Sequence, residues 1–168
     1  MARIGYPDAQ ASALADRIVA ERGSLLNLYR MLLHNPGLTE GWLRLGTAIV
    51  FELSVDDRTR ELVTCSIAAS TGASYEWHHH SRSGARLGVT DAELVVLASG
   101  DRTPFGERDR AVLDAVDVIG RDPAEAAAAI DALRTWFDDT AICELTILIG
   151  FYWMVTRVTL ALDIEADP

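Results

Sequence analysis

Residues 58–88, RTRELVTCSIAASTGASYEWHHHSRSGARLG, decide the fold of this chain. The first part, residues 58–70, carries apolar side chains at the spacing of one buried helical face. Gly72 then ends that helix, because glycine adopts the left-handed conformation of a helix terminus without strain. A second helix is expected over 73–87, with Gly88 just beyond its end. The stretch therefore predicts a pair of helices joined by a tight turn.

Helical spacing also dominates on both sides of this pair, and no alternation of Val, Ile and Thr is long enough for a sheet. Pro36 is expected to stop the helix that ends near residue 33. Ser54 or Asp56 is expected to be the N-cap of the helix over 58–70. Helices are expected at about 14–33 with a break at 23–24, from 39–42 to about 50, and at 58–70, 73–87, 89–99, 107–119, 123–137 and 140–162. We therefore predict an all-α, single-domain compact bundle of about eight helices that covers residues 1–168.

Composition excludes several classes of function. The 168 residues carry a formal net charge of −10, with 49% hydrophobic and 24% charged residues, as in ordinary soluble proteins. Nucleic acids and anionic membrane surfaces both require a basic face, so neither is an expected partner. The chain contains no lysine, which excludes lysine Schiff bases and conventional pyridoxal-phosphate chemistry.

The cysteines and the apolar segments predict a reduced, cytoplasmic protein. The two cysteines, Cys65 and Cys143, lie in apolar segments and form no C-x-x-C motif. The N-terminus lacks the apolar core of a signal peptide. The longest uncharged apolar run, between Glu144 and Arg157, is shorter than the roughly 20 residues that a membrane span needs.

The densest group of chemically active side chains is Tyr75-Glu76-Trp77-His78-His79-His80. Glu76 and His80 are four residues apart, so a helix places them within about 40° of each other around its axis. A neighbouring carboxylate orients an imidazole and makes it more basic, which prepares it for general acid–base catalysis. A solvated Glu–His pair on a helix surface would have the same spacing.

The histidines and Cys65 also bear on metal binding and on nucleophilic catalysis. Consecutive histidines on a helix point about 100° apart, so one metal ion cannot bind all three. Glu76 and His80, helped by Glu61, would supply only two or three ligands, and we predict no metal site. Cys65 would be a nucleophile only if it reached His80, whereas a cysteine in an apolar helix is commonly an inert core residue.

The motifs in and around this stretch resemble those of the carboxymuconolactone decarboxylase family, which includes the alkylhydroperoxidase D-like (AhpD-like) proteins. The resemblance is carried by Arg60-Glu61-Leu62, Ala73 twelve positions after Glu61, Tyr75-Glu76-Trp77-x-x-His80, Ala85-x-x-Gly88, Asp91-Ala-Glu-Leu, His34-Asn-Pro-Gly, and Glu144-Leu145 with Gly150-x-Tyr152. It implies an all-α AhpD-like fold and a homo-oligomer, either a trimer or a hexamer.

The peroxidase branch of that family carries the pattern E-x(11)-C-x-x-C-x-x-x-H. Glu61 and His80 match its glutamate and histidine, but its two cysteines fall on Ala73 and Glu76. The mechanism of that branch, in which the two cysteines form a disulfide, therefore cannot operate in this chain. The Y-E-W-x-x-H version is similar to the decarboxylase-like branch, whose named members act on a carboxylated lactone from aromatic-acid breakdown.

The resemblance implies a cofactor-free acid–base enzyme, a lyase acting on a small carboxylated lactone or keto acid. Its catalytic residues would be Glu61, Glu76 and His80. Substrate-binding residues would be Tyr75, Trp77, Cys65 and Arg82, with Arg60 and Arg82 as candidate anchors for a carboxylate. The alternatives are an alkylhydroperoxidase or peroxiredoxin-type activity, and a non-catalytic helical oligomer that binds a small ligand.

Overall fold

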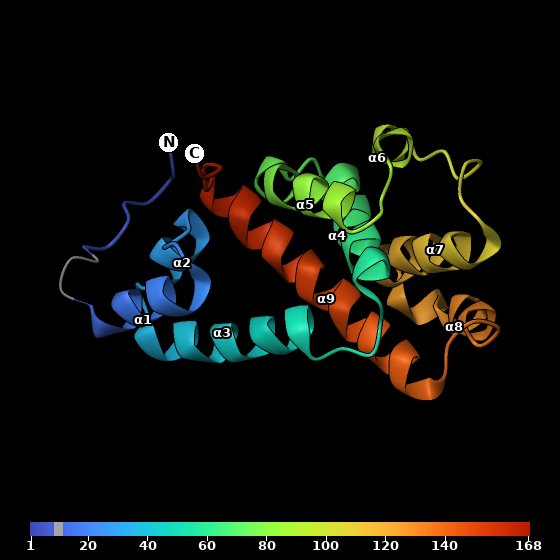
Figure 1. Cartoon of the computed structure of the whole chain (residues 1–168), viewed down its shortest axis with the longest axis horizontal. Coiled ribbons are helices and arrows are strands. Elements are labelled where there is room, and N and C mark those ends of the chain that lie inside the picture. The colour runs from blue at the N-terminus through green and yellow to red at the C-terminus, as the bar shows by residue number, and fades with distance from the viewer. Residues whose placement is uncertain (9–11) are drawn as a thin grey trace. The chain divides into compact units, whose positions relative to one another are not determined.

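The computed structural model describes residues 1–8 and 12–168, and all regular structure in these ranges is helical (Figure 1). The elements are α1 (Ala13–Arg22), α2 (Asn27–Leu32), α3 (Pro36–Phe51), α4 (Asp57–Thr71), α5 (Ser74–Arg86), α6 (Asp91–Leu97), α7 (Glu107–Arg121), the 3-10 turn η1 (Pro123–Glu125), α8 (Ala127–Leu133) and α9 (Asp139–Leu162). The predicted all-α class is confirmed. Within the described ranges there are nine α-helices, where about eight were predicted.

The described chain forms two compact units. One contains residues 1–52 and 158–168, and the other contains residues 53–157. The second unit holds α4 to α8 and most of α9, and every residue predicted to act in the site belongs to it. The single domain over residues 1–168 stays a prediction.

The central helix of the second unit is α4, and its ends follow from its sequence. Asp56 caps its start by accepting hydrogen bonds from the Thr59 amide at 2.9 Å and from Arg108 at 2.6 Å. Burial would raise the pKa of Asp56, but these hydrogen bonds and the Arg108 charge outweigh it and lower that pKa. At the other end Gly72 has φ +69°, the left-handed conformation expected for it.

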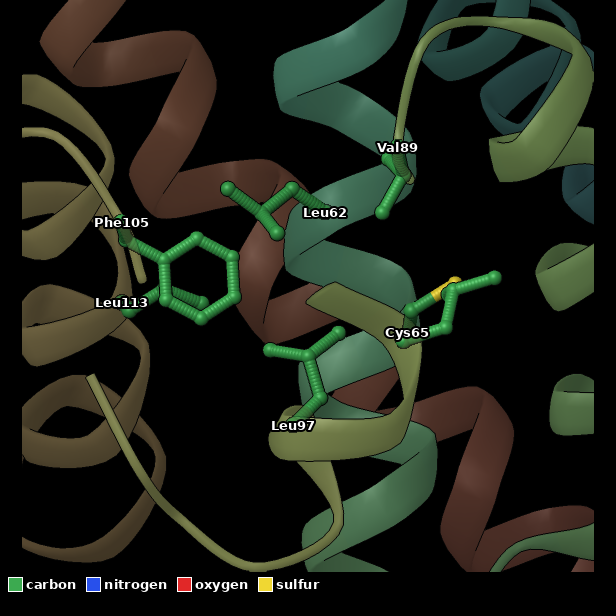
Figure 2. Close-up of a cluster of buried hydrophobic side chains, with 7 residues drawn as sticks. Leu62, Cys65, Val89, Leu97, Phe105 and Leu113 are labelled. Atoms are coloured by element: carbon green, nitrogen blue, oxygen red, sulfur yellow. The ribbon is translucent and has the colours of Figure 1, made fainter. Parts of the chain in front are cut away.

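One side of α4 packs into an apolar cluster with α6 and α7 (Figure 2). Its buried members are Leu62, Cys65, Val89, Leu94, Leu97, Phe105 and Leu113. The turn between α5 and α6 contributes Val89, and the loop before α7 contributes Phe105. This cluster fixes α4 on one side, while α5 packs along α4 from its start at Ser74 (Figure 1).

A single guanidinium ties four segments of this unit together. Arg58, in the first turn of α4, donates hydrogen bonds to the carbonyl of Gly88 at 3.0 Å, to Glu93 of α6 at 2.6 Å and to Asp109 of α7 at 2.8 Å. Gly88 follows α5 with φ +99°, and a side chain there would meet that of Arg58. Glu93 also completes the capping box of α6 with Thr90.

Two predicted boundaries are wrong. The third helix begins at Pro36 and not at 39–42, because proline suits the first helical position and Asn35 caps the Leu38 amide at 3.1 Å. The predicted helix 123–137 is broken into η1 and the short α8. Its alanine run has high helix propensity, but Leu133 is the only residue of α8 that is fully buried, and tertiary packing supplies most helical stability.

In the part of the chain that is described, α9 is the one helix with the length and composition of a membrane span. Its 24 residues exceed the uncharged run counted from the sequence, because Glu144 and Arg157 both lie within the helix. The core helix of a soluble protein has the same character, and 44% of the apolar window of α9 is buried. The helix is therefore consistent with a soluble protein.

Two glycines in long helices predict opposite effects of the same substitution. A Cβ added at Gly120 would lie 1.9 Å from Nε1 of Trp153, whereas one at Gly150 meets nothing within 4 Å. We expect Gly120→Ala to lower the free energy of unfolding by about 1–3 kcal/mol through overpacking. Gly150→Ala should raise the free energy of unfolding of a single copy by about 0.5–1 kcal/mol, because alanine is the better helix former. Urea denaturation of both variants measures this, and equal effects of the two would contradict the packing of Trp153 on Gly120.

Candidate functional site

The candidate site is built around a hydrogen bond between α4 and α5. Nδ1 of His80 lies 2.9 Å from Oε2 of Glu61, although the two residues are 19 positions apart in the sequence. The side chain of Glu61 is only 4% exposed, while that of His80 is 22% exposed. The pair therefore links a buried carboxylate to an imidazole that reaches solvent.

The partners of His80 assign its tautomer. An ionised carboxylate can only accept hydrogen bonds, so Nδ1 of His80 carries the hydrogen that Glu61 accepts. Nε2, on the other side of the ring, makes no hydrogen bond to any described residue. In the neutral imidazole Nε2 thus presents a lone pair to a bound molecule, and in the imidazolium it presents a proton.

An aromatic ring from α9 contacts the same imidazole. The rings of Tyr152 and His80 meet edge to face, with their centroids 5.1 Å apart and their planes at 83°. Tyr152 is buried and packs against Phe151 in the same way. Tyr152 was not among the predicted site residues, although the motif Gly150-x-Tyr152 contains it, because helical spacing alone cannot show which ring of α9 faces α5.

Arg60 also contacts the buried carboxylate. Its Nη2 lies 3.4 Å from Oε1 of Glu61, and its Nη1 pairs with Asp57 at the start of α4. The guanidinium is thus engaged by two acids of its own helix, and its side chain is 7% exposed. This arrangement does not present Arg60 to a molecule entering from solvent.

Glu76 is buried at 2% exposure in the first turn of α5. The helical spacing favoured a pair between Glu76 and His80, but the carboxylate that holds the imidazole is Glu61. The reason is that packing of α5 on α4 brings the two helices within hydrogen-bonding distance at Glu61, a tertiary contact that spacing within α5 does not describe. The structure therefore brings Glu61 and His80 together and leaves Glu76 inside the unit.

Two predicted substrate-binding aromatics take up different surroundings. Tyr75 is buried, and its ring lies 4.7 Å from that of His79. Trp77 is half-buried and packs against the apolar cluster of α4, α6 and α7. Trp77 therefore contributes to the core of the unit.

Arg82 lies away from the pair. It is exposed, and its Nη1 donates a hydrogen bond to Nε2 of His78 at 3.0 Å. Residues two positions apart on a helix are separated by about 200° around its axis, so Arg82 and His78 lie on the other side of α5 from His80. Arg82 is not among the side chains that surround the imidazole.

Cys65 lies in the apolar cluster (Figure 2). Burial, and secondly the charge of Glu61, raise the pKa of its thiol to about 12. The thiolate, which is the nucleophilic form, is thus suppressed at neutral pH. Cys143, by contrast, is exposed on α9.

In residues 1–8 and 12–168, no group of three or more His, Cys, Asp or Glu side chains is placed to hold a metal ion. The Glu61–His80 pair supplies two candidate ligands, fewer than the three protein ligands typical of a catalytic zinc site. The arrangement suits proton transfer by the imidazole, with the carboxylate as its orienting partner.

Solved structures with this arrangement of helices are AhpD-like. A peroxidase-related protein from Ralstonia eutropha JMP134, with an alkylhydroperoxidase AhpD core, matches at TM-score 0.84 and 18% identity over 99% of this chain and 92% of that one. A peroxidase-related protein from Silicibacter sp. TM1040 matches at TM-score 0.81 and 20% identity over 98% and 87%. The debrominase Bmp8, a cysteine-to-alanine variant in complex with 2,3,4-tribromopyrrole, matches at TM-score 0.76 and 19% identity over 99% and 90%. At these identities the similarity shows the fold.

The sequence identifies the family within this fold. The model of the carboxymuconolactone decarboxylase family matches residues 36–118, which include Glu61 and His80. The chain belongs to the carboxymuconolactone decarboxylase family, and the resemblance is confirmed. Among curated proteins, none matches the sequence.

The two thiols should differ sharply in reactivity. Because Cys65 is buried with a raised pKa and Cys143 is exposed on the surface of a single copy, Ellman's reagent should titrate one thiol in the folded monomer and two in guanidinium chloride. The variant Cys143→Ser should remove the native reaction and leave the denatured one. A second fast thiol in the native protein would contradict the placement of Cys65 in the core.

Proposed function

We propose that this chain is a cofactor-free acid–base enzyme that uses His80, oriented by Glu61, on a small carboxylated lactone or keto acid. The observation that carries the proposal is the 2.9 Å hydrogen bond that holds Nδ1 of an imidazole whose side chain is 22% exposed. The reaction is a decarboxylation or a related proton transfer next to a carbonyl group, as the family match suggests. This would make the protein a lyase, and we place it in the cytoplasm.

The proposed step needs no cofactor when the substrate accepts its own electrons. Loss of CO2 from a β-keto or vinylogous acid leaves the bonding electron pair on carbon as an enolate. The imidazolium of His80 donates its Nε2 proton to that carbon and becomes neutral, while Glu61 keeps the Nδ1 hydrogen in place. Glu76 is the second candidate acid, but at 2% exposure it lies deeper than His80.

A hydroperoxide-reducing activity is the second candidate, since two structural neighbours are named peroxidase-related. The chain has Ala73 and Glu76 where the peroxidase branch has its cysteines. Cys65 is buried, and its thiol has a pKa of about 12. The debrominase with the same fold shows that the fold alone does not fix the reaction. We therefore favour acid–base chemistry.

Single substitutions of the pair test the proposal. The protein is incubated in D2O with a panel of small keto acids and enol lactones, and proton NMR follows CO2 loss or deuterium uptake next to the carbonyl. His80→Ala should reduce turnover by about 100-fold or more, because general acid–base catalysis contributes about that much. Glu61→Gln should also lower the rate strongly. The matched control is His78→Ala, on the other side of α5, which should keep the wild-type rate.

Turnover that survives in both His80→Ala and Glu61→Gln would refute the acid–base assignment. The same preparations are assayed for reduction of tert-butyl hydroperoxide with a dithiol donor. We expect no rate above that of the donor alone. A rate that disappears in Cys65→Ser would favour the peroxidase instead.

The expected homo-oligomer is also a proposal, supported by the surface of α9. Ile147, Gly150 and Met154 are exposed and recur at helical spacing along it. We propose that a second copy of the chain covers this apolar stripe. Sedimentation velocity should find a trimer or hexamer for the wild type, and smaller species for Ile147→Asp with Met154→Asp. A wild-type monomer at micromolar concentration would exclude this.

A further inference from the structure

A row of alternating charges leads to the candidate acid–base group. Along α4 it runs from Asp57 to Arg60 and Glu61, and it then crosses to His80 on α5. The first side chain is 63% exposed, while those of Arg60 and Glu61 are 7% and 4% exposed. The row thus starts in solvent, passes through the interior of the unit and reaches the imidazole.

The two oxygens of Glu61 have different partners. Oε2 accepts from Nδ1 of His80 at 2.9 Å, and Oε1 faces Nη2 of Arg60 at 3.4 Å. The terminal torsion of a glutamate is broad, so a carboxyl group with one partner can rotate. A hydrogen-bonding partner at each oxygen, one of them the Arg60 guanidinium, fixes the carboxylate plane and so the direction from which Nδ1 is held.

The guanidinium itself is held in turn. Nη1 of Arg60 pairs with Asp57 three residues earlier on the same helix, which leaves Nη2 on the side of Glu61. A buried carboxylate without a cationic partner is costly, and Arg60 is the cation that contacts this one. Because Arg60 is buried and already contacts two carboxylates, we expect it to bind Glu61 and not the carboxylate of a substrate.

We propose that Arg60 is a positioning residue that fixes Glu61 on His80 and thereby keeps the imidazole in the tautomer with hydrogen on Nδ1. The role deepens the proposed function and rests on it, since a fixed tautomer matters to chemistry only if Nε2 is the reacting atom. Arg60 acts through Glu61 and touches no substrate.

The test reads the tautomer directly and needs no substrate. Protein labelled with 15N-histidine is examined by long-range proton–nitrogen correlation NMR, in which the two ring nitrogens of a single tautomer are widely separated. Wild-type His80 should show the Nδ1–H pattern. In Arg60→Met the carboxyl group leaves its position or loses its charge, so the two nitrogen shifts of His80 should move toward their average. Arg60→Lys keeps the positive charge but lacks the two-pronged guanidinium, so it should restore part of the difference between the two nitrogen shifts of His80.

Arg82→Met is the matched control, because it removes an arginine beside a different histidine. Arg82 donates to Nε2 of His78, so this variant should change the His78 signals and leave those of His80 as in the wild type. Circular dichroism confirms that each variant is folded. Should Arg60→Met not fold, Asp57→Asn carries the test at an exposed position, and it should shift the His80 signals in the same direction.

If the Arg60 variants fold and their His80 signals equal those of the wild type, the proposal is wrong. If Arg60→Met does not fold, unchanged His80 signals in Asp57→Asn overturn the proposal in the same way. In a turnover assay Arg60→Met should lower kcat while KM stays unchanged, which a substrate anchor would not do. If the tautomer responds but the wild type turns over no keto acid or lactone, the positioning role holds and the proposed function fails. The two ideas are thus separated by one set of samples.

Discussion

The structure of the second unit depends on one buried carboxylate. Glu61 lies at 4% exposure on α4, in the middle of a segment that is buried from Thr59 to Ala68. A buried charge destabilises a protein unless partners surround it. Removal of one partner commonly lowers stability more than replacement of the whole charged group by apolar residues. Arg60 and His80 are those partners, so α5 must pack on α4 in the register that brings His80 to Glu61. The left-handed turn at Gly72 makes that register available.

A second side of α4 carries apolar side chains. Leu62 follows Glu61 directly and points about 100° away, into the cluster with Leu97 and Phe105 (Figure 2). Cys65 lies between these two environments, four residues after Glu61. Its sulfur is in the cluster, yet the Glu61 charge still contributes to its raised pKa. Burial is the main reason that this thiol stays protonated, and the carboxylate next to His80 adds to it.

Local features of the fold could be predicted from the sequence better than tertiary ones. The N-cap of α4 at Asp56 and the turn at Gly72 follow from residue types at fixed offsets, and both were confirmed. The break in 123–137 could not be predicted from propensity, because the alanine run favours a continuous helix, and the burial of Leu133 alone within α8 becomes visible only in the structure. Pro36 was recognised as a stop, but its second role as the first residue of the next helix was missed.

The same division applies to the site. Spacing within one helix paired His80 with Glu76, whereas the partner, Glu61, belongs to another helix, and the family resemblance was what gave it a catalytic role beside His80. Tyr152 is more distant still, on the last helix, and no spacing rule relates it to α5.

The positions that carry cysteines in the peroxidase branch are occupied here by two buried residues, Ala73 at the start of α5 and Glu76 one turn into it. A methyl group and a buried carboxylate cannot form or break a disulfide. His80 is the residue of that pattern that contacts a buried carboxylate, Glu61, and is also partly exposed to solvent. Loss of the cysteines therefore leaves the histidine and its glutamate in place, and an imidazole with one nitrogen held and the other open is complete for proton transfer without them. The proposed acid–base reaction would therefore use the histidine and glutamate of the shared pattern, with Glu76 as a second candidate acid in place of a cysteine.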